Sequence, residues 1–175
     1  FRTNQVRIAE DGEILIRGEN VMLGYWNLKE ETEKVIKDGW LHTGDIGELD
    51  NNNYLKITDR KKDIIVNLGG DNISPSKIEN ILCLNENIKQ SFVYGDKKNY
   101  LVALIVPNKE FLREKEKINN VIEKINIKLT LLEKIKKIQL IDENFSIENG
   151  LMTPTMKVKR KKVTEKYKNQ LENLY

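Results

Sequence analysis

The chain has 175 residues and a small net charge of +3, with one cysteine and one histidine. The single cysteine excludes an intramolecular disulfide and any multi-cysteine metal site, and the single histidine excludes a histidine-rich one. The length suffices for one domain, or for a small domain and part of another, and no apolar run could span a bilayer. Because the sequence opens on Phe1 without a methionine or a leader-like segment, we expect a fragment of a longer, cytoplasmic protein.

The first part of the chain is predicted to be rich in β-structure. Alternating apolar residues predict a strand over Glu13–Arg17. Four turn residues, 50–53, separate two further strands, Asp45–Leu49 and Tyr54–Ile57, which we expect to form a hairpin. Between these elements the spacing of apolar residues predicts a short helix over Lys29–Lys37.

A helix follows a short strand predicted at Asp63–Val66. Ser74 supplies an N-cap hydroxyl and Pro75 suits the first helical position, so the helix should begin there and reach about Leu84. The apolar neighbours of Cys83 predict a buried thiol.

The second half of the chain continues with alternating strands and helices. Phe92–Tyr94 and Leu101–Val106 flank a polar turn, and the unbroken apolar run of the later segment predicts a central strand buried on both faces. The remaining predicted elements are a helix beginning at Lys109, a strand over Ile138–Ile141 and a terminal helix with Val163, Tyr167, Leu171 and Leu174 on its apolar face. The expected class is α+β: a small domain with a short mixed sheet flanked by helices, preceded by a β-rich piece.

Three stretches carry residues suited to chemistry. Residues 43–45, Thr-Gly-Asp, place a carboxylate after a glycine turn, where it can accept from the two adjacent hydroxyls of a ribose. Gly69 and Gly70 lack β-carbons, so a ligand chain can lie against their backbone. Residues 151–160 hold a proline turn followed by lysines. Taken singly, these stretches would be a turn aspartate, a glycine turn before a helix and a basic helix entry.

Together the stretches resemble a known family. The segment from Gly39 to Glu79, which contains Thr-Gly-Asp, Asp-Arg and the double glycine in this order, resembles the C-terminal signature of acyl- and aryl-CoA synthetases, a branch of the adenylate-forming ligases. This resemblance implies that Asp45 and Arg60 hold the ribose of ATP and of the acyl-adenylate. It also implies that Lys62 is the hinge about which a C-terminal domain rotates between two half-reactions.

The resemblance assigns roles to the other two stretches as well. Gly69 and Gly70 would help to form the tunnel for the pantetheine arm of CoA. The Thr-Pro-Thr-Met-Lys sequence resembles the last family motif in the form typical of long-chain acyl-CoA synthetases, which implies that Lys157 is the catalytic lysine. Lys159 is the alternative. An ammonium between the α-phosphate and the substrate carboxylate offsets their repulsion during acyl-adenylate formation.

The resemblance therefore implies the C-terminal part of a long-chain fatty-acid–CoA ligase. Its substrates would be a fatty acid, ATP and CoA, with acyl-AMP as intermediate and with AMP and pyrophosphate as products. Residues 1–60 would belong to the large adenylation domain and residues 61–175 to the mobile C-terminal domain. Mg²⁺ would be bound mainly by the absent N-terminal domain, with no metal ligand in this chain, and the fragment alone should be inactive.

Two other classes of function remain open. Another adenylate-forming ligase, acting on aryl or short-chain acids or loading a carrier protein, would share most of these motifs. Residues 1–104 carry 14 basic and 17 acidic side chains and residues 105–175 carry 16 and 10, most of the basic excess lying between Lys157 and Lys168. This run would suit a module that binds nucleic acid or anionic lipid, but no aromatic residue is interleaved before Tyr167. We therefore expect no nucleic-acid partner and leave peripheral membrane association open.

Overall fold

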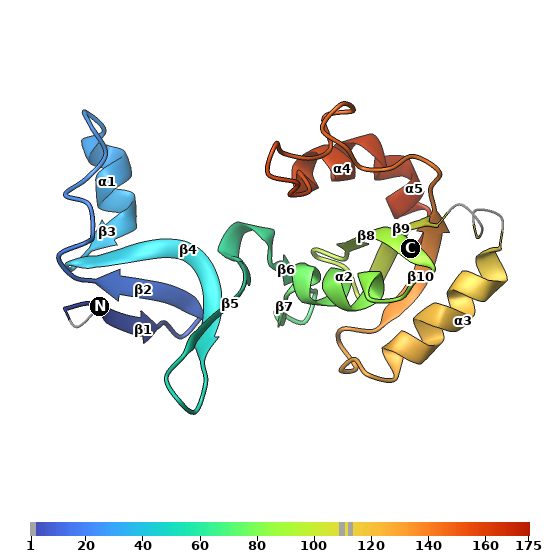
Figure 1. Cartoon of the computed structure of the whole chain (residues 1–175), viewed down its shortest axis with the longest axis horizontal. Helices are drawn as coiled ribbons and strands as arrows, with labels where there is room; N and C mark the ends of the chain where they lie inside the picture. Colours follow the sequence, from blue (N-terminus) through green and yellow to red (C-terminus); the bar gives the residue numbers. More distant parts are fainter. Residues whose placement is uncertain (1–2, 109–110, 112–113) are drawn as a thin grey trace. The chain divides into compact units, whose positions relative to one another are not determined.

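The computed structural model describes residues 3–108, 111 and 114–175. The chain divides into two compact units, Phe1–Lys62 and Asp63–Tyr175, whose elements are labelled in Figure 1. The expected α+β class is confirmed, with small sheets and short helices.

In its described residues, 3–62, the first unit contains an antiparallel sheet of five strands and one α-helix. The strand order is β1-β2-β4-β3, and β5 also pairs with β4. The elements are β1 (Gln5–Ile8), β2 (Glu13–Arg17), α1 (Lys29–Val35), β3 (Ile36–Lys37), β4 (Trp40–Leu49) and β5 (Leu55–Arg60). The predicted strand at Glu13–Arg17 and the predicted hairpin around residues 50–53 are confirmed, while β1 was not predicted.

The helix predicted over Lys29–Lys37 is wrong at its last two residues. Helix α1 ends at Val35, and Ile36 and Lys37 form β3 against Leu41 and Trp40 of β4. Asp38 and Gly39 between them both adopt positive φ, at 52° and 78°. Two successive residues with positive φ make the tight turn that matches the twist of a hairpin, so the chain leaves the helix and doubles back into the sheet.

The second unit contains a mixed three-stranded sheet, a two-stranded hairpin and four helices among the residues that the structure describes. Strand β9 lies at the centre of the sheet, antiparallel to β8 and parallel to β10. The elements are β6 (Ile65–Val66), β7 (Asn72–Ile73), α2 (Pro75–Cys83), β8 (Ile88–Tyr94), β9 (Leu101–Pro107), α3 (Lys115–Asn126), β10 (Ile135–Leu140), α4 (Arg160–Lys166) and α5 (Lys168–Glu172). A 3₁₀ turn, η1 (Lys61–Asp63), precedes them.

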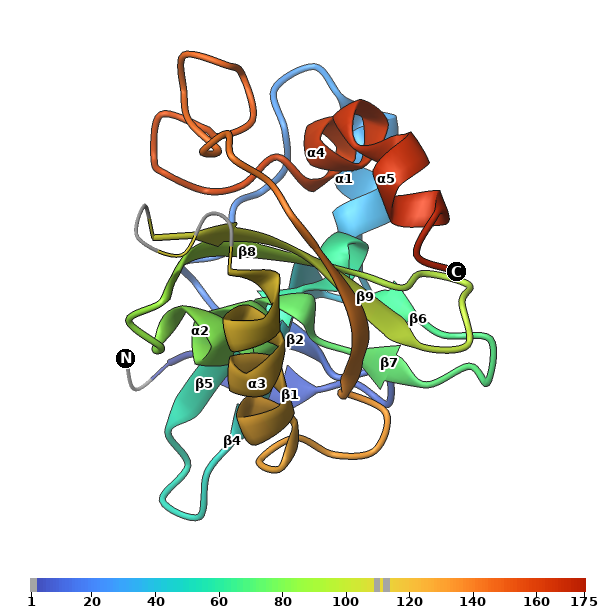
Figure 2. The same cartoon turned by 90° about the vertical axis from the view of Figure 1, so that its right-hand side faces the viewer.

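Strand β9 separates two apolar cores. All seven of its residues are buried, which confirms the predicted central strand. Leu101, Ala103 and Ile105 pack in a core that includes residues of α2 and α3. The residues between and after them, Val102, Leu104 and Val106, pack in a second core with residues of the segment 141–175. Figure 2 shows α2 and α3 on one side of this sheet and α4 and α5 on the other. The unit is therefore a sheet covered by helices on both faces.

Cys83 is exposed, so the predicted buried thiol is wrong. The buried face of α2 carries Ile78 and Leu82, both 0% exposed and spaced by one helical turn. The residue that follows Leu82 lies about 100° further round the helix, which turns Cys83 away from this core. Its sulfur lies 3.3 Å from Ser91 Oγ.

The terminal helix is divided into two. Helix α4 ends at Lys166 and α5 begins at Lys168, with Tyr167 between them at φ −103° and ψ 19°. The apolar face is nevertheless continuous, because Val163, Tyr167 and Leu171 are all buried in the same core. The helix start predicted at Lys109 lies outside the described residues. No helix in the described ranges is both long and apolar enough to cross a membrane.

Candidate functional site

Asp45 and Arg60 face each other across the β4–β5 hairpin. They occupy opposite positions in the strand register, and Arg60 Nε lies 3.0 Å from Asp45 Oδ1. The Asp45 side chain is 28% exposed and that of Arg60 is 53% exposed. The structure therefore brings together the two residues that the sequence analysis assigns to ribose, with the carboxylate still accessible to a ligand.

The turn before Asp45 is fixed by glycine geometry and by a threonine. Gly44 has φ +70°, and a β-carbon added there would meet no atom within 4 Å. Thr43 Oγ1 donates to the Ile14 carbonyl at 2.7 Å and accepts from the Asp45 amide at 3.1 Å. The turn is thus tied to β2, while the space beside Gly44 stays open for close approach of a ligand.

A buried glutamate links this turn to the residue that follows Arg60. Glu13 is 4% exposed, and its Oε1 accepts from the Gly44 amide at 2.9 Å. Its Oε2 lies 2.9 Å from both His42 Nδ1 and Lys61 Nζ. The Lys61 ammonium is also 2.6 Å from Asp11 Oδ2. We call Asp11, Glu13, His42 and Lys61 the Glu13 cluster.

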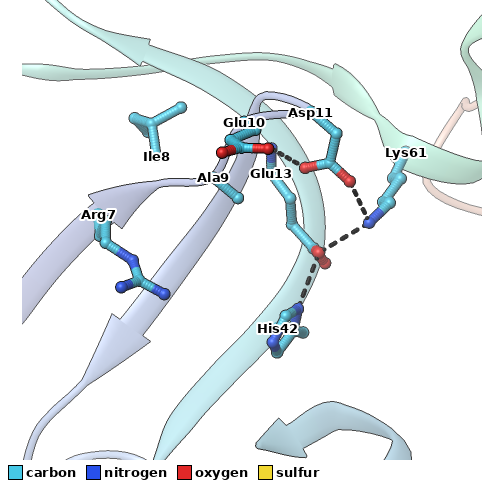
Figure 3. A pocket seen from close by; sticks show the side chains of 8 residues that line it. All are labelled: Arg7, Ile8, Ala9, Glu10, Asp11, Glu13, His42 and Lys61. Atoms are coloured by element: carbon cyan, nitrogen blue, oxygen red, sulfur yellow. Dashed lines mark hydrogen bonds and ion pairs between the residues drawn. The ribbon is translucent and has the colours of Figure 1, made fainter.

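Figure 3 shows the Glu13 cluster at the edge of a cavity in the first unit. Lys61 reaches across to the carboxylates of Asp11 and Glu13, and His42 approaches Glu13 from β4. The cavity has a volume of about 590 Å³ and is also lined by Arg7, Ile8, Ala9 and Glu10.

The contacts of the cluster favour the charged forms of Asp11, Glu13 and Lys61. Burial raises the pKa of Glu13, but the hydrogen bonds from Lys61, His42 and the Gly44 amide outweigh burial, so the net pKa is below its ordinary value. The hydrogen bond from Lys61, with that from the Glu13 amide, lowers the pKa of Asp11. The same carboxylates, Asp11 first, raise the pKa of Lys61.

Sequence reasoning missed the Glu13 cluster. A glutamate at the start of an alternating strand is normally expected on the solvent face, yet Glu13, Ile14 and Leu15 are all buried. The partners of Glu13 come from β4 and η1, far along the chain, and the β2–β4 and β4–β5 pairings bring them close. The one usable signal is that Lys61 directly follows the Asp-Arg motif.

Lys62 lies at the boundary between the two compact units. It lies in η1 with an exposed side chain, and it is the last residue of the first compact unit. Lys61 is held by two carboxylates, whereas the next residue begins the passage to the second unit.

Gly69 and Gly70 lie in the loop that joins β6 to β7 in the second unit. Gly70 has φ +86° with open space beside it, whereas a β-carbon on Gly69 would lie 3.1 Å from Asp71 Oδ2. The Asp71 amide donates to Asn67 Oδ1 at 2.9 Å, and Asn67 Nδ2 donates to Asp71 Oδ2 at 3.0 Å. The Asp71 carboxylate is therefore engaged inside its own loop.

Lys157 and Lys159 both have exposed side chains on the loop before α4. An antiparallel bridge between Met152 and Val158 closes the turn that contains Lys157, and Lys159 follows this bridge. The structure thus holds Asp45 and Arg60 together in the first unit, while Gly69, Gly70 and Lys157 belong to the second.

No group of three or more His, Cys, Asp or Glu side chains in residues 3–108, 111 and 114–175 is placed to hold a metal ion.

The small α+β unit with its mixed sheet is the fold of the C-terminal region of adenylation enzymes. The adenylation domain of a carboxylate reductase from Mycobacterium chelonae superposes with a TM-score of 0.85 at 26% identity, over 98% of this chain and 30% of that one. The A domain of a carboxylic acid reductase from Segniliparus rugosus, solved with AMP and a carboxylic acid, gives a TM-score of 0.86 at 24% identity, over 98% and 31%. The latter likeness establishes the fold alone.

The chain belongs to the AMP-binding enzymes, whose C-terminal domain matches residues 62–175. Among its relatives, a long-chain-fatty-acid–CoA ligase of Mycobacterium tuberculosis is 36% identical over 98% of this chain and 32% of the relative. Long-chain-fatty-acid–CoA ligase 5 of Rattus norvegicus is 38% identical over 98% and 29%. Ligase 1 of Homo sapiens is 37% identical over 98% and 28%. The chain thus spans about a third of the length of these relatives.

Proposed function

We propose that this chain is the C-terminal part of an ATP-dependent long-chain fatty-acid–CoA ligase. The ligase would form acyl-AMP from a fatty acid and ATP with release of pyrophosphate, and would then transfer the acyl group to the CoA thiol with release of AMP. The observation that carries this proposal is the identity of 36–38% to long-chain ligases over 98% of the chain. The solved carboxylate reductase domains are less similar, at 24–26% identity.

In this proposal the first unit contributes to the nucleotide site. The Asp45 carboxylate would accept hydrogen bonds from the two ribose hydroxyls of ATP, and Arg60 would orient that carboxylate through their 3.0 Å contact. The left-handed Gly44 lets the nucleotide approach the turn closely. Mg²⁺ would be held mainly by the part of the ligase outside this chain.

The second unit contributes the lysine and the CoA path. Lys157 would place its ammonium between the α-phosphate and the fatty-acid carboxylate, where it offsets the repulsion of two anions and stabilises the developing charge. Gly69 and Gly70 would line the pantetheine tunnel in the thioester-forming arrangement. Gly70 suits this role because it leaves open space beside a left-handed backbone.

The two half-reactions would use two orientations of the second unit, with Lys62 as the pivot. Residues 1–60 would belong to the large adenylation domain and residues 61–175 to the mobile domain. The exposed side chain of Lys62 and its place at the end of the first unit support this role. The 175-residue chain alone should not catalyse the overall reaction.

The proposal is tested with the purified full-length ligase. Pyrophosphate release, acyl-AMP and acyl-CoA are measured separately with a 16-carbon fatty acid, a short-chain acid and an aryl acid. We expect all three signals to be largest with the 16-carbon acid and acyl-CoA to require free CoA. Preference for an aryl or short-chain acid, or transfer only to a carrier protein, would favour the other adenylate-forming reading.

A further inference from the structure

The turn that carries Lys157 is closed by hydrogen bonds between its own residues. The Thr153 amide donates to the Lys157 carbonyl at 2.8 Å, and the Lys157 amide donates to Thr153 Oγ1 at 3.0 Å. Met156 adopts a positive φ of 61°, which reverses the chain. The side chains from Pro154 to Lys157 are exposed and touch no core. Where the turn points is therefore decided by how its two ends are held.

The entering end is held by burial. Leu151 and Met152 are 3% and 7% exposed in the core that β9 shares with the C-terminal helices. The Met152 amide donates to the Ser146 carbonyl at 2.9 Å. This end of the turn cannot move without opening that core.

The leaving end is held by Arg160. Its Nη1 lies 2.7 Å from Glu79 Oε1 on α2, and its Nη2 donates to the Val93 carbonyl on β8. The same Glu79 oxygen accepts from the Val93 amide at 2.7 Å. The guanidinium also lies over the Phe92 ring, 4.5 Å from its centre.

This contact is suited to fixing a position. The Arg160 and Glu79 side chains are only 16% and 15% exposed, so removing either one leaves the other charge poorly solvated. A planar guanidinium can bond a carboxylate and a carbonyl together, which a lysine ammonium on a flexible stem does less rigidly. The two residues before it tie this end back to the entering end: Val158 bridges Met152, and the Lys159 amide donates to the Leu151 carbonyl at 2.8 Å. Arg160 adds the side-chain contacts with α2 and β8.

We propose that Arg160, held by Glu79, is a positioning residue that fixes the Lys157 turn onto α2 and β8. Arg160 touches no reacting atom in this scheme. It sets where the backbone of Lys157 leaves the domain, and so where the ammonium can reach. The catalytic consequence rests on the proposed function, whereas the structural consequence does not.

The structural consequence is tested by amide hydrogen exchange on the 175-residue chain. Arg160→Ala should speed exchange at the Lys157 and Lys159 amides by about tenfold or more, while the amides of central strand β9 keep their protection. Lys162→Ala is the matched control, since Lys162 lies on the same helix with a 66% exposed side chain. Equal loss of protection in β9 would show that Arg160 only supports overall stability, and unchanged exchange at Lys157 and Lys159 would also overturn the proposal.

Two milder variants keep this test usable if Arg160→Ala fails to fold. Arg160→Lys retains a cation for Glu79 but not the fork, and Glu79→Gln retains an acceptor for the Val93 amide but not the charge. Both should show the same pattern with smaller increases. A stable, folded Arg160→Lys with full protection of the turn would contradict the need for the guanidinium.

The catalytic consequence is tested in the full-length ligase. A displaced lysine should lower the turnover number of acyl-AMP formation by roughly a hundredfold, because small misplacements of a catalytic group are costly. Thioester formation from supplied acyl-AMP and the KM for ATP should stay close to those of the unaltered ligase. If Lys157→Ala abolishes adenylation and Arg160→Ala does not, the positioning role is wrong. If Lys157→Ala itself has no effect, the proposed function of the turn fails instead.

Discussion

At the scale of single residues, Lys157 carries the clearest prediction. In the proposed full-length ligase, Lys157→Ala should lower the rate of acyl-AMP formation by roughly a hundredfold to a thousandfold, since an ammonium acting between two anions contributes roughly 3–4 kcal/mol. Thioester formation from supplied acyl-AMP should survive. Pyrophosphate release and acyl-CoA formation measure the two steps separately.

Lys159→Ala is the matched variant for this experiment. Lys159 is exposed on the same loop, but it lies beyond the bridge that closes the turn. We expect its replacement to leave adenylation within a few-fold of the unaltered ligase. Loss of adenylation in Lys159→Ala with retention in Lys157→Ala would move the catalytic position by two residues.

Gly70 gives a second prediction at this scale. Its φ of +86° is unfavourable for an L-residue, although no atom lies within 4 Å of the added β-carbon. Gly70→Ala should therefore lower the free energy of unfolding by about 1–2 kcal/mol through backbone strain. Urea unfolding followed by circular dichroism measures this change. A fully stable Gly70→Ala would mean that the loop can adopt another conformation.

At the scale of elements, the Glu13 cluster joins β2, β4 and η1 through hydrogen bonds and an ion pair. The buried carboxylate of Glu13 contacts the Lys61 ammonium, the His42 ring and the Gly44 amide. In Glu13→Gln, Lys61 keeps its contact with Asp11, but the buried side chain loses its charge and one of its two acceptor oxygens. Glu13→Gln should therefore lower the stability of the first unit by roughly 1–3 kcal/mol at pH 7. Both tryptophans, Trp26 and Trp40, lie in this unit, so their fluorescence reports its unfolding.

The stability that Glu13 contributes should depend on pH. Its folded pKa lies below the ordinary 4.5, so the contribution is present above about pH 4.5 and is lost as the pH falls through the folded pKa. The difference between the unaltered chain and Glu13→Gln should thus shrink in acid. Glu48→Gln, on the exposed part of β4, should change little at any pH. An equal loss from Glu13→Gln at pH 3 and pH 7 would show that the charge of Glu13 is not used.

Elements with a pattern of apolar or turn residues several positions long could be predicted from the sequence. Elements that depend on partners far along the chain could not. The β4–β5 hairpin and the buried strand β9 follow from turn residues and from an unbroken apolar run. Strands of two residues, such as β3 and β7, are too short to show any periodicity. Their existence depends on pairing, which the local sequence does not record.

The same division holds for the candidate site. Asp45 and Arg60 could be named because two short motifs mark them, and the hairpin register then places them opposite each other. Glu13 and Glu79 carry no such mark, since a buried acid differs from an exposed one only through its partners. Those partners, Lys61 and Arg160, lie far along the chain.

At the scale of the whole molecule, the proposed pivot at Lys62 has a direct test. Proline fixes φ and removes the amide donor, so Lys62→Pro should hold the second unit in one orientation. One half-reaction of the full-length ligase should then collapse while the other persists. Lys62→Ala is the control, because it leaves the backbone free to turn.

Acyl-AMP formation and CoA-dependent consumption of acyl-AMP are measured separately for both variants. Equal losses in the two half-reactions, or no loss in either, would show that Lys62 is an ordinary surface lysine. The Glu13 cluster sharpens this expectation. Since Lys61 is bound to two carboxylates of the first unit, rotation should start after Lys61 and spare it.

The exposure of Cys83 would make the proposed rotation measurable. It is the only thiol in these 175 residues and it lies on the accessible side of α2, so a spin label attached there would travel with the second unit. A second label at Glu48→Cys would report on the first unit, once any cysteines elsewhere in the proposed ligase are replaced. Pulsed resonance spectroscopy would then give one distance distribution with ATP and fatty acid, and another with CoA. Two separate populations would reveal the swing directly, without an assay of turnover.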